Sequence, residues 1–184
     1  GTISTIAGIG LPGGIAVDHA GNVYVAIQVS HQVRRITPEG VTSTVAGTGT
    51  QGFGGDGGLA TEALLTWPYG VAADSAGNLY IAELFNQRVR KVTPAGIITT
   101  IAGSSVAGFA GDGGRATEAR LNNPAGLALD AAGNLYIADS GNHRIRKVTP
   151  AGIITTVAGG PYSGLGSEGV PATASNLYQP MGVA

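Results

Sequence analysis

The sequence repeats itself with a fixed period of 56 residues, and this repeat limits the possible folds more than any other feature. The aspartates that close an apolar run stand at Asp18, Asp74 and Asp130, and a Gly-Asn pair follows each of them. Prolines keep the same period at Pro12, Pro68, Pro124 and Pro180. No gap is needed from Pro12 to the end of the chain. A repeat of this length indicates one supersecondary unit that stacks against its own copies.

Each unit contains four short segments of strand type. In the third unit these are "GLALD", "LYIA", "HRIRKVT" and "IITTVAG", separated by the turn sequences "AAGN", "DSGN" and "PAG". Four strands joined by short loops form an antiparallel meander, whose small sheet must stack on its neighbours to bury both faces. A β-sandwich built from hairpins is the competing fold, but it does not require a gapless repeat. The sequence therefore predicts an all-β fold, a β-propeller of four-stranded antiparallel blades.

The repeat also predicts how the blades divide the chain. Three full blades are expected at about residues 11–48, 67–104 and 123–160, with partial strands at both ends, in residues 1–8 and 179–184. Propellers close with about four to eight blades. We therefore expect residues 1–184 to form a single propeller segment that belongs to a longer chain.

Composition narrows the choice of partner and compartment. Ten basic and eleven acidic residues give a net charge of −1, so the chain lacks the basic excess of a nucleic-acid binder. It has no cysteine for a disulfide or a thiolate metal site, and no apolar run approaches the ~20 residues that span a bilayer. The low charged fraction of 11%, with abundant Gly, Ala and Thr, favours an exported bacterial protein. We expect an extracellular or periplasmic location.

The third unit carries a recognisable pattern, "NNPAGLALDAAGNLYIADSGNHRIRKVTPAGIITTVAG". It resembles the NHL repeat, with Asn142-His143-Arg144-Ile145 at the Asn-His-Leu signature. The segment "GFAGDGGRATEARLNNP" is similar to linkers in bacterial secreted NHL proteins and in the NHL propeller of teneurins. The resemblance covers essentially the whole chain. It implies a propeller that binds proteins or other macromolecules, although some relatives are lyases with a metal in the central channel.

The two faces of the predicted propeller differ in sequence. The first-to-second and third-to-fourth turns share one face and are nearly uniform ("DHAGN", "DSAGN", "DAAGN"; "TPEG", "TPAG", "TPAG"), as expected of turn chemistry. The second-to-third loops ("IQVSHQ", "ELFNQR", "DSGNHR") vary, and they share the other face with the blade-to-blade connectors. Variable loops on a rigid scaffold are where binding specificity is written. Candidate binding residues are Gln28, Val29, His31, Glu83, Leu84, Phe85, Asn86, Asp139, Ser140, Asn142 and His143.

An alternative role is open for some of these residues. The apolar side chains of Val29, Leu84 and Phe85 could instead pack on a neighbouring blade or connector. His31 and His143 occupy equivalent positions, but Gln87 fills that position in the second unit, which breaks a metal-ligand set. We expect the two histidine rings to form hydrogen bonds with a loop backbone or with solvent.

The connector stretch "GFGGDGG", residues 52–58, formally matches the dinucleotide fingerprint G-x-G-x-x-G. That fingerprint requires a βαβ unit, and the second copy has Ala110 in place of Gly54. Asp56 and Asp112 are calcium candidates, but Ca²⁺ takes six to eight oxygen ligands and each loop offers one acid. No metal site or cofactor is therefore expected. The insert is also optional. Only four positions separate Gly8 from Pro12, whereas 21 positions separate Gly47 from Pro68 and Gly103 from Pro124.

These patterns favour a non-enzymatic module that binds or scaffolds a protein or other macromolecule. No G-x-S-x-G nucleophile elbow is present. Two alternatives remain: a propeller-type lyase or hydrolase with a channel metal, and a structural repeat in an extracellular array or fibre. Self-association is compatible with all three. A nucleic-acid partner and a membrane span are not expected.

Overall fold

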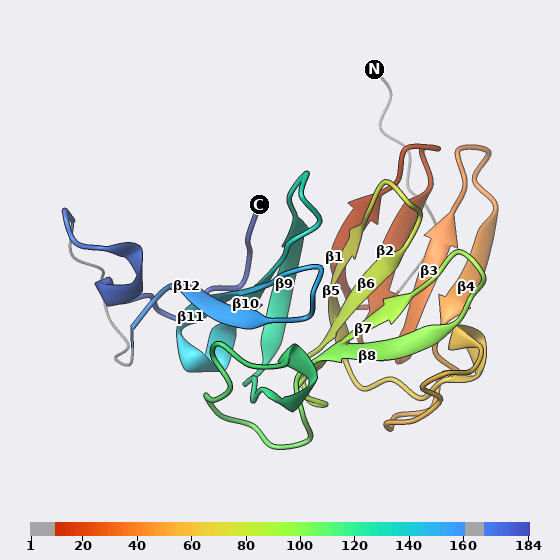
Figure 1. Ribbon diagram of the computed structural model, residues 1–184. Helices are drawn as coiled ribbons and strands as arrows, with labels where there is room; N and C mark the ends of the chain where they lie inside the picture. Colours follow the sequence, from red (N-terminus) through yellow and green to blue (C-terminus); the bar gives the residue numbers. More distant parts are fainter. Residues whose placement is uncertain (1–9, 161–167) are drawn as a thin grey trace.

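The computed structural model describes residues 10–160 and 168–184, which contain three four-stranded sheets (Figure 1). The strands of blade 1 are β1 (Pro12–Val17), β2 (Val23–Ile27), β3 (Gln32–Ile36) and β4 (Thr42–Ala46). Blade 2 contains β5 (Pro68–Ala73), β6 (Leu79–Glu83), β7 (Arg88–Val92) and β8 (Ile98–Ala102). Blade 3 contains β9 (Pro124–Leu129), β10 (Leu135–Asp139), β11 (Arg144–Val148) and β12 (Ile154–Ala158).

Every sheet is an antiparallel meander whose strands pair in chain order, which confirms the predicted all-β propeller blades. Short 3-10 helices are the only helical elements of the described residues: η1 (Ala60–Glu62), η2 (Ala116–Glu118), η3 (Ser140–Asn142) and η4 (Ala172–Ala174). In that part of the chain no helix has the length and apolar character needed to cross a membrane. The partial blade predicted in residues 1–8 lies outside the described residues.

The first strand of each blade lies innermost, where β1 packs beside β5 and β5 packs beside β9. Glycine makes this close approach possible, because a Cβ on Gly70 would collide with the carbonyl oxygen of Ala125. A Cβ on Gly126 would lie 2.7 Å from the carbonyl oxygen of Met181, so residues 179–184 lie against β9 although they form no regular strand.

The hydrophobic core lies between successive blades rather than within one sheet. Fully buried side chains recur at equivalent positions: Leu65, Ile81 and Ile98 at the first junction, and Leu121, Ile137 and Ile154 at the second. Burying one such side chain stabilises the fold by about 1.5–3 kcal/mol. Two sheet faces are needed to cover each of these residues, so the repeat can fold only when its copies stack.

The first-to-second turns confirm the predicted turn chemistry. In blade 2, Oδ1 of Asp74 accepts hydrogen bonds from the backbone N–H of Ala76 and Asn78, at 3.0 Å and 2.8 Å. Its Oδ2 accepts from the Asn78 side chain at 2.8 Å and from the Tyr80 hydroxyl at 3.0 Å. Gly77 adopts a φ of +80°, which glycine tolerates without strain. Asp18 and Asp130 make the same set of bonds in the other two blades.

These bonds determine the ionisation of the turn groups. Burial alone would raise the pKa of Asp74, but hydrogen bonds from Asn78 and Tyr80 lower it below its ordinary value. Burial, together with the hydrogen bond to Asp74, raises the pKa of Tyr80 to about 12.

In Figure 1 the two turns of blade 1 lie at the top of the view, and the connector to blade 2 lies below. We call the lower surface, with the second-to-third loops and the connectors, the connector face.

Candidate functional site

Each connector of the connector face docks on the blade that follows it. In the first connector, Asp56 receives two hydrogen bonds from Arg90 of β7, from Nε at 3.0 Å and from Nη2 at 2.6 Å. Nη2 of Arg90 also donates to the carbonyl oxygen of Gly54 at 3.2 Å. The hydroxyl of Thr100 donates to the other carboxylate oxygen of Asp56 at 2.7 Å. The glycine-rich loop is therefore bound within the protein by an arginine. We call this contact of Arg90 with Asp56 and Gly54 the arginine clamp of blade 2.

The second connector repeats this clamp 56 residues later. Arg146 donates to Oδ1 of Asp112 from Nε at 3.2 Å and from Nη2 at 2.7 Å, and to the carbonyl oxygen of Ala110 at 3.3 Å. Both Asp56 and Asp112, the calcium candidates, are thus engaged by a guanidinium, which supplies the positive charge that calcium would bring. No cluster of three or more potential metal-binding side chains occurs in the described ranges.

A second acid lies on the inner side of each arginine. Glu83 accepts a hydrogen bond from Nη1 of Arg90 at 3.2 Å, so the guanidinium lies between the carboxylates of Glu83 and Asp56. The side chains of Arg90 and Glu83 are both fully buried. Glu83 also accepts from the Thr66 backbone N–H at 2.7 Å and from the Asn86 amide at 2.6 Å. Burial raises the pKa of Glu83, although the Thr66 hydrogen bond and the charge of Arg90 oppose that rise.

In the third blade the inner acid is Asp139, whose Oδ2 accepts a hydrogen bond from Nη1 of Arg146 at 3.2 Å. Asp139 is fully buried, and burial raises its pKa, although hydrogen bonds from the Asn142 side chain and the Asn122 backbone N–H oppose that rise. The structure therefore places two predicted contact residues, Glu83 and Asp139, in the interior. Such buried carboxylates hold the connector and are not accessible to a macromolecular partner.

The predicted amide and hydroxyl residues also serve the scaffold. The side chain of Asn86 donates to the carbonyl oxygen of Gly52 at 2.8 Å, and that of Asn142 donates to the carbonyl oxygen of Gly108 at 2.7 Å. Ser140 is buried, and its hydroxyl lies 3.4 Å from the sulfur of Met181. These contacts join the second-to-third loops of blades 2 and 3 to the segments that enter or follow those blades.

The histidine position links one blade to the next. Nδ1 of His31 accepts a hydrogen bond from the backbone N–H of Trp67 at 3.2 Å, and Nδ1 of His143 accepts from Gln179 at 3.1 Å. The carbonyl oxygen of the Gln87 side chain replaces the ring and accepts from the Asn123 N–H at 2.7 Å. The expected backbone hydrogen bond is thus present in all three blades. Glutamine can stand for histidine because the position needs only an acceptor.

Phenylalanines that sequence reasoning passed over also belong to this face. Phe53 packs under the guanidinium of Arg88, 3.9 Å from the ring centroid, and Phe109 packs under that of Arg144 at 3.8 Å. Both rings remain more than two-fifths exposed. Their recurrence at one connector position, 56 residues apart, is the sequence signal that identifies them.

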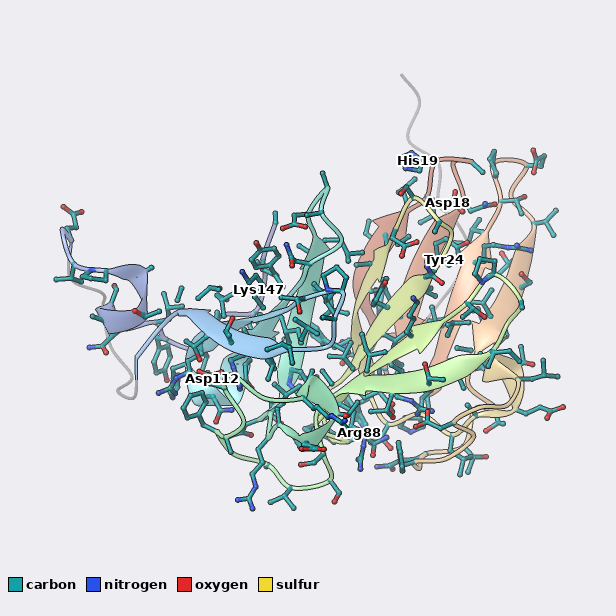
Figure 2. All side chains as sticks on the ribbon, viewed as in Figure 1. Asp18, His19, Tyr24, Arg88, Asp112 and Lys147 are labelled. Carbon is teal, nitrogen blue, oxygen red and sulfur yellow. The ribbon has the colours of Figure 1, made fainter. Side chains whose placement is uncertain are left out.

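Seven predicted binding residues keep accessible surface on the connector face, and three of them, His31, Asn86 and His143, are the half-buried residues whose side chains make the hydrogen bonds described above. Phe85 is 54% exposed and Val29 is 49% exposed, while Leu84 and Gln28 are half-buried. Phe85 also packs against Trp67, with ring centroids 5.3 Å apart, so its exposed ring is held in place. We call the surface that carries the first-to-second and third-to-fourth turns the turn face. Figure 2 shows Arg88 and Asp112 on the lower side of the molecule, opposite Asp18 and His19 of the turn face.

A hollow opens between blades 2 and 3. It measures about 590 Å³ and is lined by residues that include Tyr80, Lys91, Thr117 and Pro150. A smaller hollow of about 260 Å³ lies at the equivalent place between blades 1 and 2, beside Tyr24 and its neighbours. The hollows recur with the repeat, so they follow from the way in which successive blades diverge.

Comparison with known proteins finds the same architecture. The family model of the teneurin NHL domain matches residues 48–109 and 107–179. Human Teneurin-4 is 36% identical over 138 residues, which cover 68% of this chain and 5% of that protein.

Two solved structures from Bacteroides thetaiotaomicron show the same fold. A protein of unknown function aligns with a TM-score of 0.72 at 24% identity, over 94% of this chain and 42% of that one. An auxiliary nutrient binding protein aligns with a TM-score of 0.68 at 19% identity, over 92% of this chain and 41% of that one. The chain therefore spans less than half the length of each of these proteins.

Proposed function

Because the chain belongs to the teneurin NHL domain family of NHL-repeat proteins, we propose that it is a non-enzymatic binding or scaffold module. Its partner is a protein or another macromolecule, and the connector face is the contact surface. The single observation that carries this proposal is the ring of Phe85, which is 54% exposed and yet fixed against Trp67. Rigid, half-exposed aromatic side chains are typical anchors of binding interfaces.

The surroundings of Phe85 support the same role. Val29 and Phe53 expose 49% and 44% of their surface on the same face. The clamps hold this face rigid, so its exposed side chains lose little conformational freedom when a partner binds. The contact set that we propose is Gln28, Val29, Leu84 and Phe85, together with Phe53 and Phe109. It leaves out His31, Asn86 and His143, whose side chains are engaged in hydrogen bonds within the protein.

The setting that we propose is extracellular or periplasmic. The low charged fraction of 11% and the absence of cysteine suit an exported protein. A net charge of −1 argues against a nucleic-acid partner.

A matched pair of positions tests the contact surface. A photo-crosslinking amino acid is introduced at Phe85 and, separately, at Val41, which is 62% exposed on the turn face. We expect one identified macromolecule to be crosslinked from position 85 and not from position 41. The affinity of that partner is then measured for Phe85→Ser and Val41→Ser, together with the melting temperature of each variant.

We expect Phe85→Ser to weaken binding by about tenfold or more, as loss of an interface anchor does, at nearly unchanged melting temperature. Val41→Ser should bind as the unmodified protein does. Equal crosslinking from both positions would contradict the assignment of the connector face. A Phe85→Ser variant that melts early but binds normally would place this ring in the structural core.

A further inference from the structure

Within residues 10–160 and 168–184, no segment covers the outer edge of blade 1 as the connectors cover the outer edges of blades 2 and 3. In blade 2, the connector pairs with β8 as an additional strand: Gly57 donates to the carbonyl oxygen of Ile98 at 2.8 Å, and Ile98 donates back to Gly58 at 3.0 Å. In blade 3, residues 113 and 114 pair with Ile154 of β12 in the same way, at 2.8 Å and 3.1 Å. Only four positions separate Gly8 from Pro12, so no insert of this length precedes β1.

The side chains of β4 reflect this difference. Thr42 is exposed, at the position of Ile98 and Ile154, which are fully buried by both a neighbouring blade and the connector. An exposed edge strand presents unpaired backbone N–H and C=O groups, which can pair with a segment from another chain.

The cation of the clamp is nevertheless kept in blade 1. Arg34 occupies the position of Arg90 and Arg146, but Ile27 replaces the inner acid, Glu83 or Asp139. None of the ion pairs recorded among the described residues involves Arg34. Blade 1 also keeps Thr44, directly across from Arg34 in the sheet. This threonine is the equivalent of Thr100, whose hydroxyl donates to Asp56 in blade 2.

We propose that the outer edge of blade 1 binds an extended acidic peptide segment of a partner protein. The segment pairs with β4 as the connectors pair with β8 and β12, and its carboxylate accepts hydrogen bonds from Arg34 and Thr44. Charge complementarity favours an acidic occupant, since a guanidinium forms strong, charge-assisted hydrogen bonds with a carboxylate. This site lies apart from Phe85 and goes beyond the contact surface proposed above.

The two occupied clamps also predict which part of the segment matters. In blades 2 and 3 the phenylalanine of the connector packs on Arg88 or Arg144, but blade 1 has Gln32 at that position. A phenylalanine on the segment therefore has no cation to pack against in blade 1. We expect recognition to depend on the aspartate of the segment and only weakly on an aromatic residue.

The probe is a fluorescent peptide with the connector sequence of residues 50–60, TQGFGGDGGLA, titrated against the intact protein. We expect saturable binding that weakens at least tenfold in Arg34→Gln and equally when the peptide aspartate is replaced by asparagine. Arg35→Gln is the matched control, because it removes the same charge from the next position of β3, whose side chain points to the opposite sheet face. Binding to this variant should be unchanged.

Three results would overturn the proposal. The first is no binding at millimolar peptide concentration, and the second is equal binding to the unmodified protein and Arg34→Gln. The third is an equal loss of binding in Arg34→Gln and Arg35→Gln, which would indicate a general effect of charge. Melting temperatures measured alongside show whether each variant is folded. A folded Arg34→Lys variant keeps the positive charge and should recover part of the affinity that Arg34→Gln loses. None of these outcomes depends on Phe85, so the two proposals fail separately.

Discussion

Arg90 donates from both Nε and Nη2 to a single carboxylate oxygen of Asp56, although the two residues stand 34 positions apart. The third donor nitrogen of Arg90 reaches Glu83, which is fully buried. One arginine thus joins a connector to β6, the second strand of its blade. Buried ion pairs of this kind fix geometry more than they add net stability, and removal of one partner is costly because a charge is left buried.

Replacing Glu83 by glutamine leaves Arg90 without its fully buried counter-charge. We expect Glu83→Gln to lower the free energy of unfolding by about 3–5 kcal/mol, the usual cost of breaking a buried pair. Asp56→Asn should cost less, about 1–3 kcal/mol, because water screens a side chain that is 39% exposed. Denaturant unfolding measures both. The control is Glu118→Gln, whose exposed pair with Arg115 should contribute almost nothing, and a Glu83→Gln effect as small as this control would contradict the clamp.

Gly70 brings the inner strands of blades 2 and 3 together. Gly70→Ala should be strongly destabilising, by about 1–3 kcal/mol or more, because the added methyl group meets the carbonyl oxygen of Ala125. Gly58→Ala is the matched control, since its Cβ would make only ordinary contact, 3.4 Å from the Gly55 oxygen. Thermal melting of the two variants checks the prediction. Equal melting temperatures would mean that the inner strands can separate without loss.

The hydrogen bond from Trp67 to His31 predicts a pH dependence. Burial lowers the pKa of His31, so the folded protein holds the neutral ring, whose Nδ1 is the acceptor. The associated stability is fully present above the ordinary histidine pKa and is lost as the pH falls through the lowered value. His31→Gln, which copies the arrangement at Gln87, should remove this part of the pH dependence. Unfolding free energies compared at pH 7.5 and pH 5 test this, and an unchanged slope in His31→Gln would contradict it.

The turn aspartates predict a second effect in a more acidic range. Because hydrogen bonds from Asn78 and Tyr80 outweigh the effect of burial and lower the pKa of Asp74, the charged form stabilises the fold. That contribution is present above the ordinary aspartate pKa and is lost as the pH falls through the lowered value. At pH 7 we expect Asp74→Asn to cost about 1 kcal/mol, the typical value of a hydrogen bond. The difference between the variant and the unmodified protein should shrink with acidification, and a constant difference would show that Asp74 acts without its charge.

The sequence by itself determined the features that rest on local contacts. The turn around Asp74 closes through hydrogen bonds that reach at most six residues along the chain, to Tyr80. Such short contacts leave a pattern that recurs with every repeat, so the strand number, the turn types and the blade architecture could be predicted. A hydrogen bond of the His31 and His143 rings with a loop backbone could also be expected, but not the partners Trp67 and Gln179, which lie 36 residues along the chain.

Only the tertiary structure decided which loop residues are buried. Glu83 and Phe85 stand two positions apart in one variable loop, yet Glu83 is fully buried and Phe85 is 54% exposed. The cause is Arg90, which draws the acid inward and is itself held by Asp56 from 34 residues away. A single sequence does not reveal a pairing over that distance, because it depends on how a connector folds back onto the next blade. The glycine-rich connector could therefore be found from its repeat, but its function as an arginine clamp required the fold.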